Sequence, residues 1–394
     1  MNMFFRIMLD YDQLADHIVA NIPEHIFVSK TTTFIDPAFA GGQLLKAVAR
    51  RLRKYNHSIE NIRSRLFGYE DNIAYICHPK NKSTAIVANL SIAKYSKLLK
   101  GEIVKKKFSV VLGNDPYQGV NEVNSDRKQP KSHSLWAEFL PWSFGVTEDN
   151  GYVVKVSPDS WMSPTHIGFK TFKQKQLICA DLDCSKYFPG VNSSFTWWIA
   201  KNSPVTKDTK LGKLNFNFNN FDYIPRNPDK SLGIHKKVVL PKLPKLDIKY
   251  DTTCHSTKPY VKNDITDEFC FPHLHTNAQT RYSNIKSKYF DNKKIFWSAS
   301  GYYIPRKNYG DIGYTECAGC ITADSDYEVE CYYSMMNSSL YRFIIESGKW
   351  SGFINGTVVG KLPKLEMKVW TDKEIYNYFK ITKEEQNYIE QFLK

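Results

Sequence analysis

The sequence predicts an α/β protein in which strands and helices alternate in the first half, followed by a mixed α+β second half. Short apolar segments that end in polar or proline-containing turns recur along the first half. Between them lie segments whose apolar residues repeat at helical spacing. Because parallel strands need a crossover connection, this alternation favours a largely parallel sheet. At 394 residues the chain is long enough for two domains, each with its own core.

The elements of the first domain follow one another in a regular order. Helices with an apolar face are expected at 11–29 (together with a loop), 43–55, 71–77 and 134–144. Strands are expected at 33–35, 65–70, 84–90, 108–113, 151–156, 176–181 and 194–200. The resulting order of strands and helices is that of a sheet covered by helices.

The composition changes near residue 204, where the chain becomes rich in Pro, Lys and Asn with short aromatic strands. We therefore expect a first domain at 1–203 and a second domain at 204–394. An internal echo links 242–249 to 361–368, which share the pattern Lys-Leu-Pro-Lys-Leu. It indicates either two copies of a basic hairpin that faces phosphates or a chance similarity. The chain closes with one or two amphipathic helices at 372–394.

The chain is strongly basic, with a formal net charge of +14. Such a field suits a polyanionic partner, although an AT-biased genome would also produce a Lys- and Asn-rich chain. The 24 Tyr, 24 Phe and 8 Trp residues offer many stacking surfaces. No run of about 18 apolar residues offers a membrane span, and the acidic N-terminal region does not resemble a signal peptide. We therefore expect a cytoplasmic protein without a membrane partner.

The eight cysteines are scattered, as expected in a reducing compartment. Two pairs have the spacing of zinc ligands, Cys270 with His273 and Cys317 with Cys320. The gap between the pairs is long, and three further residues compete for the same role: His255, His275 and Cys331. Whether these side chains bind zinc stays open, and no metal is assigned.

The most informative segment is an apolar strand, 108–113, that runs into Asn114-Asp115-Pro116-Tyr117. This turn resembles the Asn/Asp-Pro-Pro-Tyr signature of enzymes that methylate exocyclic amino groups of DNA bases, with Asp115 in place of the first proline. The resemblance implies that Asn114 Oδ1 and the carbonyl of residue 115 accept the two amino hydrogens. Tyr117 would stack on a base swung out of the duplex. The plain alternative is a strand that ends in an ordinary Asp-Pro turn.

A second motif, 34–45, consists of a strand, a turn of small residues and the start of a helix. It resembles the Asp-Pro-Ala-x-Gly-x-Gly loop that holds S-adenosylmethionine in DNA amino-methyltransferases. The resemblance implies that the cofactor contacts a set of loop residues, namely Asp36, Pro37, Ala38, Ala40 and Gly42. Glu70, at the end of the next strand, is expected on the ribose hydroxyls. Ala40 departs from the usual glycine, and its methyl group disfavours positive φ.

The order of the motifs resembles the γ class of DNA amino-methyltransferases, in which the cofactor loop precedes the catalytic turn. Residues 187–199 resemble a late strand of that class, in which an aromatic residue packs on the extruded base. Phe195 is the candidate for that role, or else an ordinary core aromatic. The class also has an acidic residue on the adenine of the cofactor, and 91–101 offers no clear match. The resemblance covers roughly residues 10–200 and continues loosely to the C-terminus.

The resemblance implies a Rossmann-like S-adenosylmethionine-dependent methyltransferase sheet with a C-terminal target-recognition domain. The expected activity is sequence-specific methylation of adenine N6 in double-stranded DNA, as in restriction–modification systems, with cytosine N4 left open. A cognate restriction endonuclease is a conceivable partner, and the oligomeric state is undetermined. Four basic residues are the candidates to hold phosphates: Lys236, Lys237, Lys242 and Lys245.

Two alternatives stay open at this point. The first is a catalytically degenerate paralogue or partner subunit that binds DNA without turnover, which the departures at Ala40 and Asp115 would suit. The second is an enzyme of the same fold that transfers a different group or acts on an already modified base.

Overall fold

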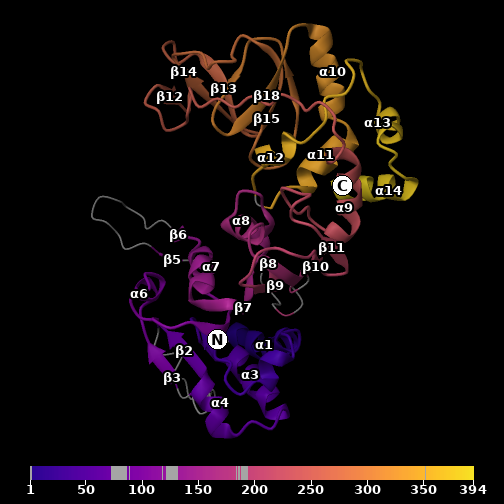
Figure 1. Cartoon of the computed structure of the whole chain (residues 1–394). Coiled ribbons are helices and arrows are strands. Elements are labelled where there is room, and N and C mark those ends of the chain that lie inside the picture. Colours follow the sequence, from indigo (N-terminus) through magenta and orange to yellow (C-terminus); the bar gives the residue numbers. More distant parts are fainter. Residues whose placement is uncertain are drawn as a thin grey trace. The chain divides into compact units, whose positions relative to one another are not determined.

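The computed structural model describes residues 2–71, 87, 89–117, 119–120, 132–182, 184, 187, 194–350 and 352–394 (Figure 1). The chain forms two compact units. Unit 1 comprises Met1–Trp161 and Thr165–Asn219, and unit 2 comprises Met162–Pro164 and Asn220–Lys394. The division thus falls after the expected position at residue 203. The reason is that two short strands beyond it, β10 (Thr209–Leu211) and β11 (Leu214–Phe216), extend the sheet of unit 1.

Unit 1 is built on a nine-stranded sheet in the order β11-β10-β8-β9-β7-β4-β1-β2-β3. The strands from β3 to β7 in this order run parallel, whereas β9 is antiparallel to both of its neighbours. Their bounds are β1 Phe34–Asp36, β2 Leu66–Glu70, β3 Asn89–Ile92, β4 Phe108–Gly113, β7 Thr147–Pro158, β8 Gln176–Asp181 and β9 Phe195–Lys201. The predicted α/β class is therefore confirmed.

The strand order reverses at β1. From β1 the chain builds outward through β2 and β3, then returns to place β4 on the other side of β1. Phe34 pairs with Leu66 of β2 on one side and with Val110 of β4 on the other. In open parallel sheets, ligands bind in the crevice outside the carboxyl ends of the strands where the order reverses. The residues that follow β1 and β4 are therefore the place to look for a site.

Helices cover both faces of this sheet, because side chains alternate along each strand. Phe34 and Leu112 join the core cluster that contains apolar residues of the second half of α1 (Asn2–Ala20), of α3 (Gln43–Lys54) and of α4 (Ile59–Arg65). Ile35 and Val111, the adjacent residues, join the opposite cluster. That cluster contains the apolar side chains of α6 (Tyr95–Leu99) and α7 (Leu135–Val146).

Most elements of unit 1 follow the expected ranges. The strands at 108–113 and 176–181 have the predicted bounds, and the helix at 43–54 ends one residue early. The segment 11–29 divides into the end of α1 and the short α2 (His25–Val28). The expected helix at 71–77 and most of the strand at 84–90 lie outside the described residues.

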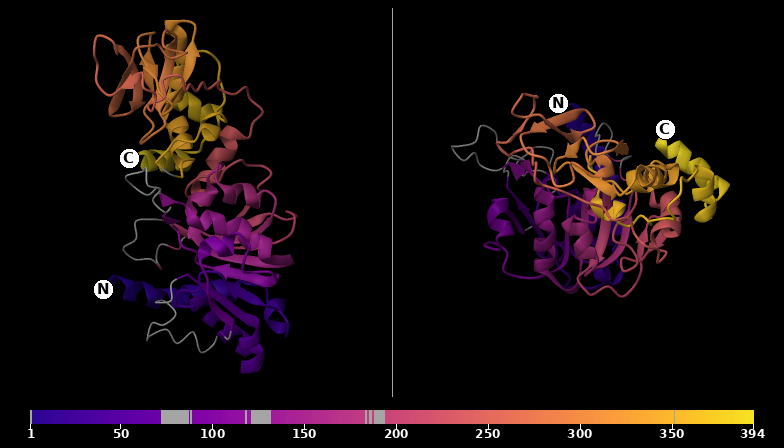
Figure 2. Two further views of the ribbon diagram at one scale, coloured as in Figure 1. Left: turned by 90° about the vertical axis from the view of Figure 1, so that its left-hand side faces the viewer. Right: turned by 90° about the horizontal axis from the view of Figure 1, so that it is seen from above.

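Unit 2 is a mixed α+β unit with two small sheets. The sheets have the orders β12-β14-β13-β17 and β16-β15-β18. In Figure 2 these strands, in orange, gather apart from the last helices, in yellow. The strands are β12 Val261–Lys262, β13 Phe271–Thr276, β14 Gln279–Ser283, β15 Lys293–Ser298, β16 Arg306–Asn308, β17 Gly313–Tyr314 and β18 Ala318–Ala323. The helices are α9 Pro228–Val239, α10 Asp326–Met336, α11 Ser339–Ser347, α12 Gly356–Val359, α13 Asp372–Tyr378 and α14 Lys383–Leu393.

The two echoing segments of unit 2 pair with each other. Lys245 and Pro363 form an isolated antiparallel bridge. The Lys364 amide donates to Pro244 O at 2.7 Å, and the Leu246 amide donates to Leu362 O at 3.1 Å. The repeated pattern therefore builds one antiparallel pairing between the two segments, whereas the sequence left open two copies of a hairpin or a chance similarity. Among the described residues, no helix is both long and apolar enough to cross a membrane.

Candidate active site

The first part of the site is the loop that follows β1. Asp36 ends the strand, is buried, and accepts a hydrogen bond from the Ala38 amide at 3.0 Å. The loop then turns sharply, with φ of 41° at Ala40 and 67° at Gly42. Glycine adopts such left-handed angles at little cost, whereas alanine does so with strain. The departure at Ala40 therefore falls on a position whose backbone favours glycine.

Glu70 ties this loop to the neighbouring strand. Its Oε2 accepts from the Ala40 amide at 2.8 Å, and its Oε1 accepts from the Tyr95 hydroxyl at 3.0 Å. The Phe39 amide adds a bond to Tyr69 O at 2.8 Å. The buried Glu70 carboxylate thus supports the loop directly, a role that the sequence did not indicate. Its expected contact with a ribose stays a prediction.

The second part of the site is the turn that follows β4. The Tyr117 hydroxyl donates to Asn114 Oδ1 at 2.5 Å. The Tyr117 ring lies against Phe195, the first residue of β9, with ring centroids 4.9 Å apart and planes 31° from parallel. Burial raises the pKa of the Tyr117 phenol, so the hydroxyl keeps its hydrogen near neutral pH. Asn114, Tyr117 and Phe195 therefore form one connected group, and the structure brings the predicted aromatic pair together.

Asp115 is neither solvated nor free. Its Oδ1 accepts from Lys155 Nζ at 2.8 Å, and the two side chains are only 6% and 2% exposed. Lys155 lies on β7 directly across from Gly113. A Cβ atom on Gly113 would lie 3.0 Å from Asp115 Oδ1, 3.1 Å from Lys155 Nζ and 3.3 Å from Asp36 Oδ1. Three charged groups therefore meet beside the bare backbone of Gly113.

Asp36 is affected by this meeting of charges. Burial raises its pKa to about 7, while the Lys155 ammonium opposes the rise and Asp115 adds to it. Lys155 was not among the site residues predicted from the sequence. A usable signal was present, because a lysine interrupts an otherwise apolar strand at 151–156.

A small cavity of about 50 Å³ joins the two parts of the site. Its walls come from the cofactor-loop motif, from Asn114 and from Tyr11 of α1, and the complete lining is Tyr11, Asp36, Ala38, Phe39, Ala40, Gln43, Leu44 and Asn114. Tyr11 shares a hydrogen bond with Asn114, and burial raises the pKa of its phenol. Tyr11 was not expected here, since its sequence neighbourhood is an ordinary amphipathic helix.

The comparisons with known proteins agree with this arrangement. Residues 23–195 match the model of the Eco57I restriction-modification methylase family. This part of the chain is therefore similar to that family. The matched region contains β1, the turn after β4 and the start of β9, and it therefore includes every site residue described above except Tyr11.

Two solved structures show the same fold at low identity. The DrdV–DNA complex has a TM-score of 0.53 and 11% identity, covering 92% of this chain and 55% of that chain. A nuclease-deletion mutant of the type ISP restriction-modification enzyme LlaGI, in complex with a DNA substrate mimic, has a TM-score of 0.50 and 9% identity. Its match covers 84% of this chain and 51% of that chain. This chain therefore spans about half the length of either one. No curated protein sequence matches the chain.

Outside the matched region, the four residues with zinc-ligand spacing do not form a group. Cys270 is exposed, and His273 Nε2 accepts from the Ser287 amide at 3.2 Å. Cys320 is buried and donates to the Tyr314 hydroxyl at 3.3 Å. Only Cys317 joins a group of ligand-type side chains in the described residues, together with His275 and Glu316. The spacing had left a zinc site open, and the structure does not bring these four side chains together, because they have separate partners.

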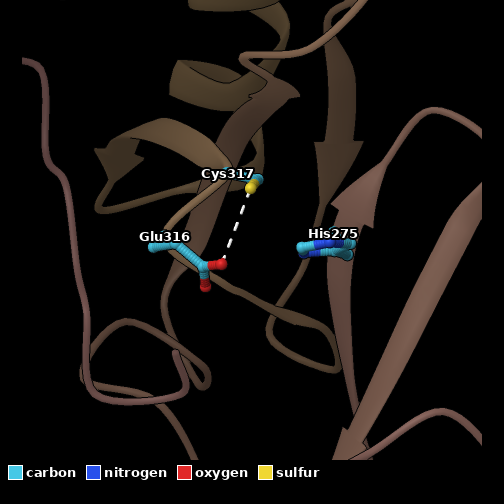
Figure 3. Close-up of side chains that lie close together, drawn as sticks. All are labelled: His275, Glu316 and Cys317. Atoms are coloured by element: carbon cyan, nitrogen blue, oxygen red, sulfur yellow. Dashed lines mark hydrogen bonds between the residues drawn. The ribbon is translucent and has the colours of Figure 1, made fainter. Parts of the chain in front are cut away.

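Figure 3 shows the Glu316 carboxylate near both Cys317 and His275. Glu316 accepts from the Ser256 amide at 2.8 Å, from the Ser256 hydroxyl at 2.5 Å and from Cys317 Sγ at 3.6 Å. The His275 ring in turn shares a hydrogen bond with Thr315 at 2.9 Å. These bonds account for the group as a link between loops without an ion.

The four candidate phosphate-binding lysines differ in their surroundings. Lys236 and Lys242 are exposed. The Lys237 ammonium instead binds Glu385 at 2.6 Å, and the Lys245 ammonium donates to Val239 O at 3.2 Å. Lys236 and Lys242 are therefore the better placed of the four to meet a polyanion.

Proposed function

We propose that the chain is an S-adenosylmethionine-dependent DNA methyltransferase that acts on an exocyclic amino group, with adenine N6 as the target. The observation that carries the proposal is the meeting of Asp36 and Asn114 in the wall of one cavity, at the point where the strand order reverses. A methyl donor held by the first loop would therefore lie next to a base held by the second.

The residues of the first loop fit the cofactor chemically. The buried Asp36 carboxylate would face a cationic ligand, and the small side chains of Ala38 and Ala40 let the backbone approach it closely. Glu70 would meet the ribose from the end of β2. When bound, S-adenosylmethionine supplies an activated methyl group. The cavity of about 50 Å³ is much smaller than the nucleoside part of S-adenosylmethionine. Tyr11 would therefore have to swing away from Asn114 to admit the cofactor.

The second loop would prepare the base. The lone pair of an aromatic amino group is delocalised into the ring, which makes the nitrogen a poor nucleophile. Two acceptors, Asn114 Oδ1 and the carbonyl of residue 115, would draw the amino hydrogens out of the ring plane and free that lone pair. Asn114 Oδ1 already accepts from Tyr117, but an amide oxygen has two lone pairs and keeps one for the base.

The base would stack on the Tyr117 and Phe195 rings. Their centroids lie 4.9 Å apart, whereas a base inserted between them needs about 7 Å, twice the ~3.5 Å contact distance of carbon atoms. Either the rings separate or the base packs on one outer face. The proposal includes extrusion of the base, because an enzyme that does chemistry on a base must take it out of the stack to reach the target atom.

Double-stranded DNA is the proposed substrate and unit 2 the proposed reader of its sequence. The exposed Lys236 and Lys242 would hold phosphates, and the loops of unit 2 would contact base edges. A restriction endonuclease partner is proposed only in so far as the methylase family belongs to restriction–modification systems.

A second candidate function is DNA binding without turnover. The closeness of Tyr11 to Asn114 favours it, because Tyr11 occupies space that the cofactor would need. Calorimetric titration with S-adenosylmethionine and with its demethylated product separates the two functions. Absence of heat with either ligand would favour the binding protein.

The proposed function is tested most simply in an expressing host that lacks its own DNA methylation. Genomic DNA from hosts that express the wild type or Asn114→Ala is digested, and the nucleosides are separated and identified by mass spectrometry. We expect N6-methyladenine from the wild type alone. Unmodified adenine together with N4-methylcytosine would correct the base, and unmodified DNA from a folded, cofactor-binding protein would overturn the proposal.

A further inference from the structure

Lys155 is an unusual residue for its position. It lies in the interior of β7, where the adjacent side chains of Val153, Val154 and Val156 are buried and apolar. Its own residue is 3% exposed, and its ammonium also lies 5.9 Å from the centre of the Phe139 ring. A charged group is costly to bury unless it is paired. Something at this point must therefore compensate for the cost.

The compensating group is the carboxylate of the catalytic turn. Lys155 is paired in the sheet with Gly113, and its side chain reaches past that residue to Asp115 at 2.8 Å. Gly113 leaves the room for this contact, since any side chain there would press against all three charged groups. The ion pair thus ties the residue after Asn114 to the neighbouring strand.

The ion pair between Lys155 and Asp115 restrains the turn at 114–117, which contains only one proline, Pro116. Pro116 fixes its own φ, but residue 115 has an ordinary backbone that a ring does not restrain. A buried pair with one partner on a central strand restrains it instead, because the carboxylate cannot leave the ammonium without leaving both charges unpaired.

We infer that Lys155 is a positioning residue for the methyl-transfer site: through Asp115 it fixes the carbonyl of residue 115 and the adjacent Asn114 where they meet the target amino group. The inference rests on the proposed function. A second consequence is that the Asp115 carboxylate stays turned toward Lys155 and away from the base, so it serves neither as a general base nor as a hydrogen-bond acceptor for the substrate.

The inference differs from a purely structural role for the pair. If the pair only stabilised the fold, its loss would lower the amount of folded protein and leave the folded fraction equally active. If it positions the turn, folded protein would transfer methyl groups slowly while still binding cofactor. The loss of the Lys155 ammonium also lets the pKa of Asp36 rise further, so cofactor binding is compared at a pH well above 7. There Asp36 is ionised, and the loss of a neighbouring cation should not weaken the binding of cationic S-adenosylmethionine.

The test compares four variants in the full chain: Lys155→Met, Asp115→Pro, the double variant, and Arg65→Met as the matched control. Arg65 is another buried cation of unit 1, at 3% exposure, and it donates to Thr32 O at 2.6 Å and Asn61 Oδ1 at 3.0 Å. These partners precede β1 and β2, at the opposite end of the strands from Asn114. For each variant, three quantities are measured: the thermal midpoint, the cofactor Kd by calorimetry and the single-turnover methyl-transfer rate per folded molecule.

We expect Lys155→Met to transfer methyl groups about 10²-fold more slowly, the size of effect that a misplacement of about 1 Å produces, with a cofactor Kd that is unchanged or lower. Asp115→Pro alone should also be slow, because it leaves Lys155 buried without its partner. The double variant should recover most of the rate and of the thermal midpoint, since proline restrains the turn and methionine needs no counter-charge. Arg65→Met should lose thermal stability only.

Equal rates per folded molecule for Lys155→Met and wild type would overturn the inference and leave the proposed function in place. So would a double variant no faster than either single one. A wild-type chain that transfers no methyl group to any duplex would overturn the proposed function and this inference together.

Discussion

The Tyr117 hydroxyl donates a hydrogen bond of 2.5 Å to Asn114 Oδ1, the atom proposed to grip the target amino group. Without a substrate, the acceptor is therefore held in place by the residue that is proposed to stack on the base. The same tyrosine packs against Phe195 from β9. Tyr117 thus contacts Asn114 through its hydroxyl and Phe195 through its ring. Substitutions at residue 117 can test the two contacts separately.

We predict that Tyr117→Phe stays within about threefold of the wild-type methyl-transfer rate, whereas Tyr117→Ala loses about 10–10²-fold, as expected from stacking worth roughly 1–3 kcal/mol per base. The Phe variant keeps the aromatic ring and loses only the hydroxyl, whereas the Ala variant loses both. We expect the ring to supply the stacking surface and the hydroxyl only to orient Asn114. The measurement is the single-turnover rate on the same duplex. If the Phe variant is as slow as the Ala variant, the contribution of Tyr117 to the methyl-transfer rate comes from its hydroxyl and not from its ring.

Asn114→Ala should abolish most of the methyl-transfer activity while leaving cofactor binding almost unchanged. We expect a loss of about 10²–10³-fold in methyl transfer, the range seen when one preorganised polar group of an active site is removed. The cofactor Kd should change little, because Asp36 and Glu70 form the other part of the site. A matched set of calorimetric and kinetic measurements checks this. A parallel loss of cofactor binding would mean that Asn114 holds the loop after β1, not the base.

Ala40→Gly should stabilise the protein. Ala40 has φ of 41°, and a left-handed alanine costs roughly 1–2 kcal/mol, which the entropy of glycine offsets in part. We expect a gain in the free energy of unfolding of about 0.5–1 kcal/mol in urea titration, with equal or tighter cofactor binding. Ala49, a helical residue of α3, provides the control, because glycine there should destabilise. A loss of stability in Ala40→Gly would show that the backbone at residue 40 is not strained.

Stability should depend on pH through Asp36. Burial raises the pKa of its carboxyl to about 7, against about 4 in the unfolded chain. Because the folded state holds this proton more tightly, the stabilisation is fully present below pH about 4 and is lost as the pH rises through about 7. Relative to Asp36→Asn, the wild type should lose up to about 1.4 kcal/mol of unfolding free energy per pH unit across this window. Parallel curves for the two proteins would contradict the raised pKa.

DNA binding should lose salt dependence when exposed lysines of unit 2 are removed. Lys236→Ala and Lys242→Ala should each lower the slope of log K against log salt by about 1 on a random-sequence duplex. Lys237→Ala should change it less, because its ammonium already binds Glu385 at 2.6 Å. Titrations at several salt concentrations measure the slopes. Equal slopes for all four proteins would place the phosphate contacts elsewhere.

The sheet of unit 1 was predictable because its strands are buried and short, and each ends in a marked turn. The ranges 108–113 and 176–181 needed no correction, and the helix at 43–54 only lost its last residue. The strands β10 and β11 were assigned to the second domain, since their composition resembles that domain. Their place in the sheet depends on pairing with β8, which is a tertiary interaction.

The site was predictable where single segments carry it and unpredictable where distant segments meet. Asp36 and Asn114 were predicted from their own turns, and the structure places both in the wall of one cavity. Lys155 and Tyr11 were not, because what makes them part of the site is a neighbour far along the chain. The question of a zinc site, which the spacing left open, depended on tertiary contacts as well, since Cys317 and Cys320 are close in sequence but have different partners.

The most direct test of the account is a reaction of the purified chain with duplex DNA and S-adenosylmethionine carrying a deuterated methyl group, followed by mass spectrometry of the nucleosides. The account predicts deuteromethyl on adenine N6 with the wild type and a loss of about 10²–10³-fold with Asn114→Ala. Label on no base, or equal label with Asn114→Ala, would contradict it.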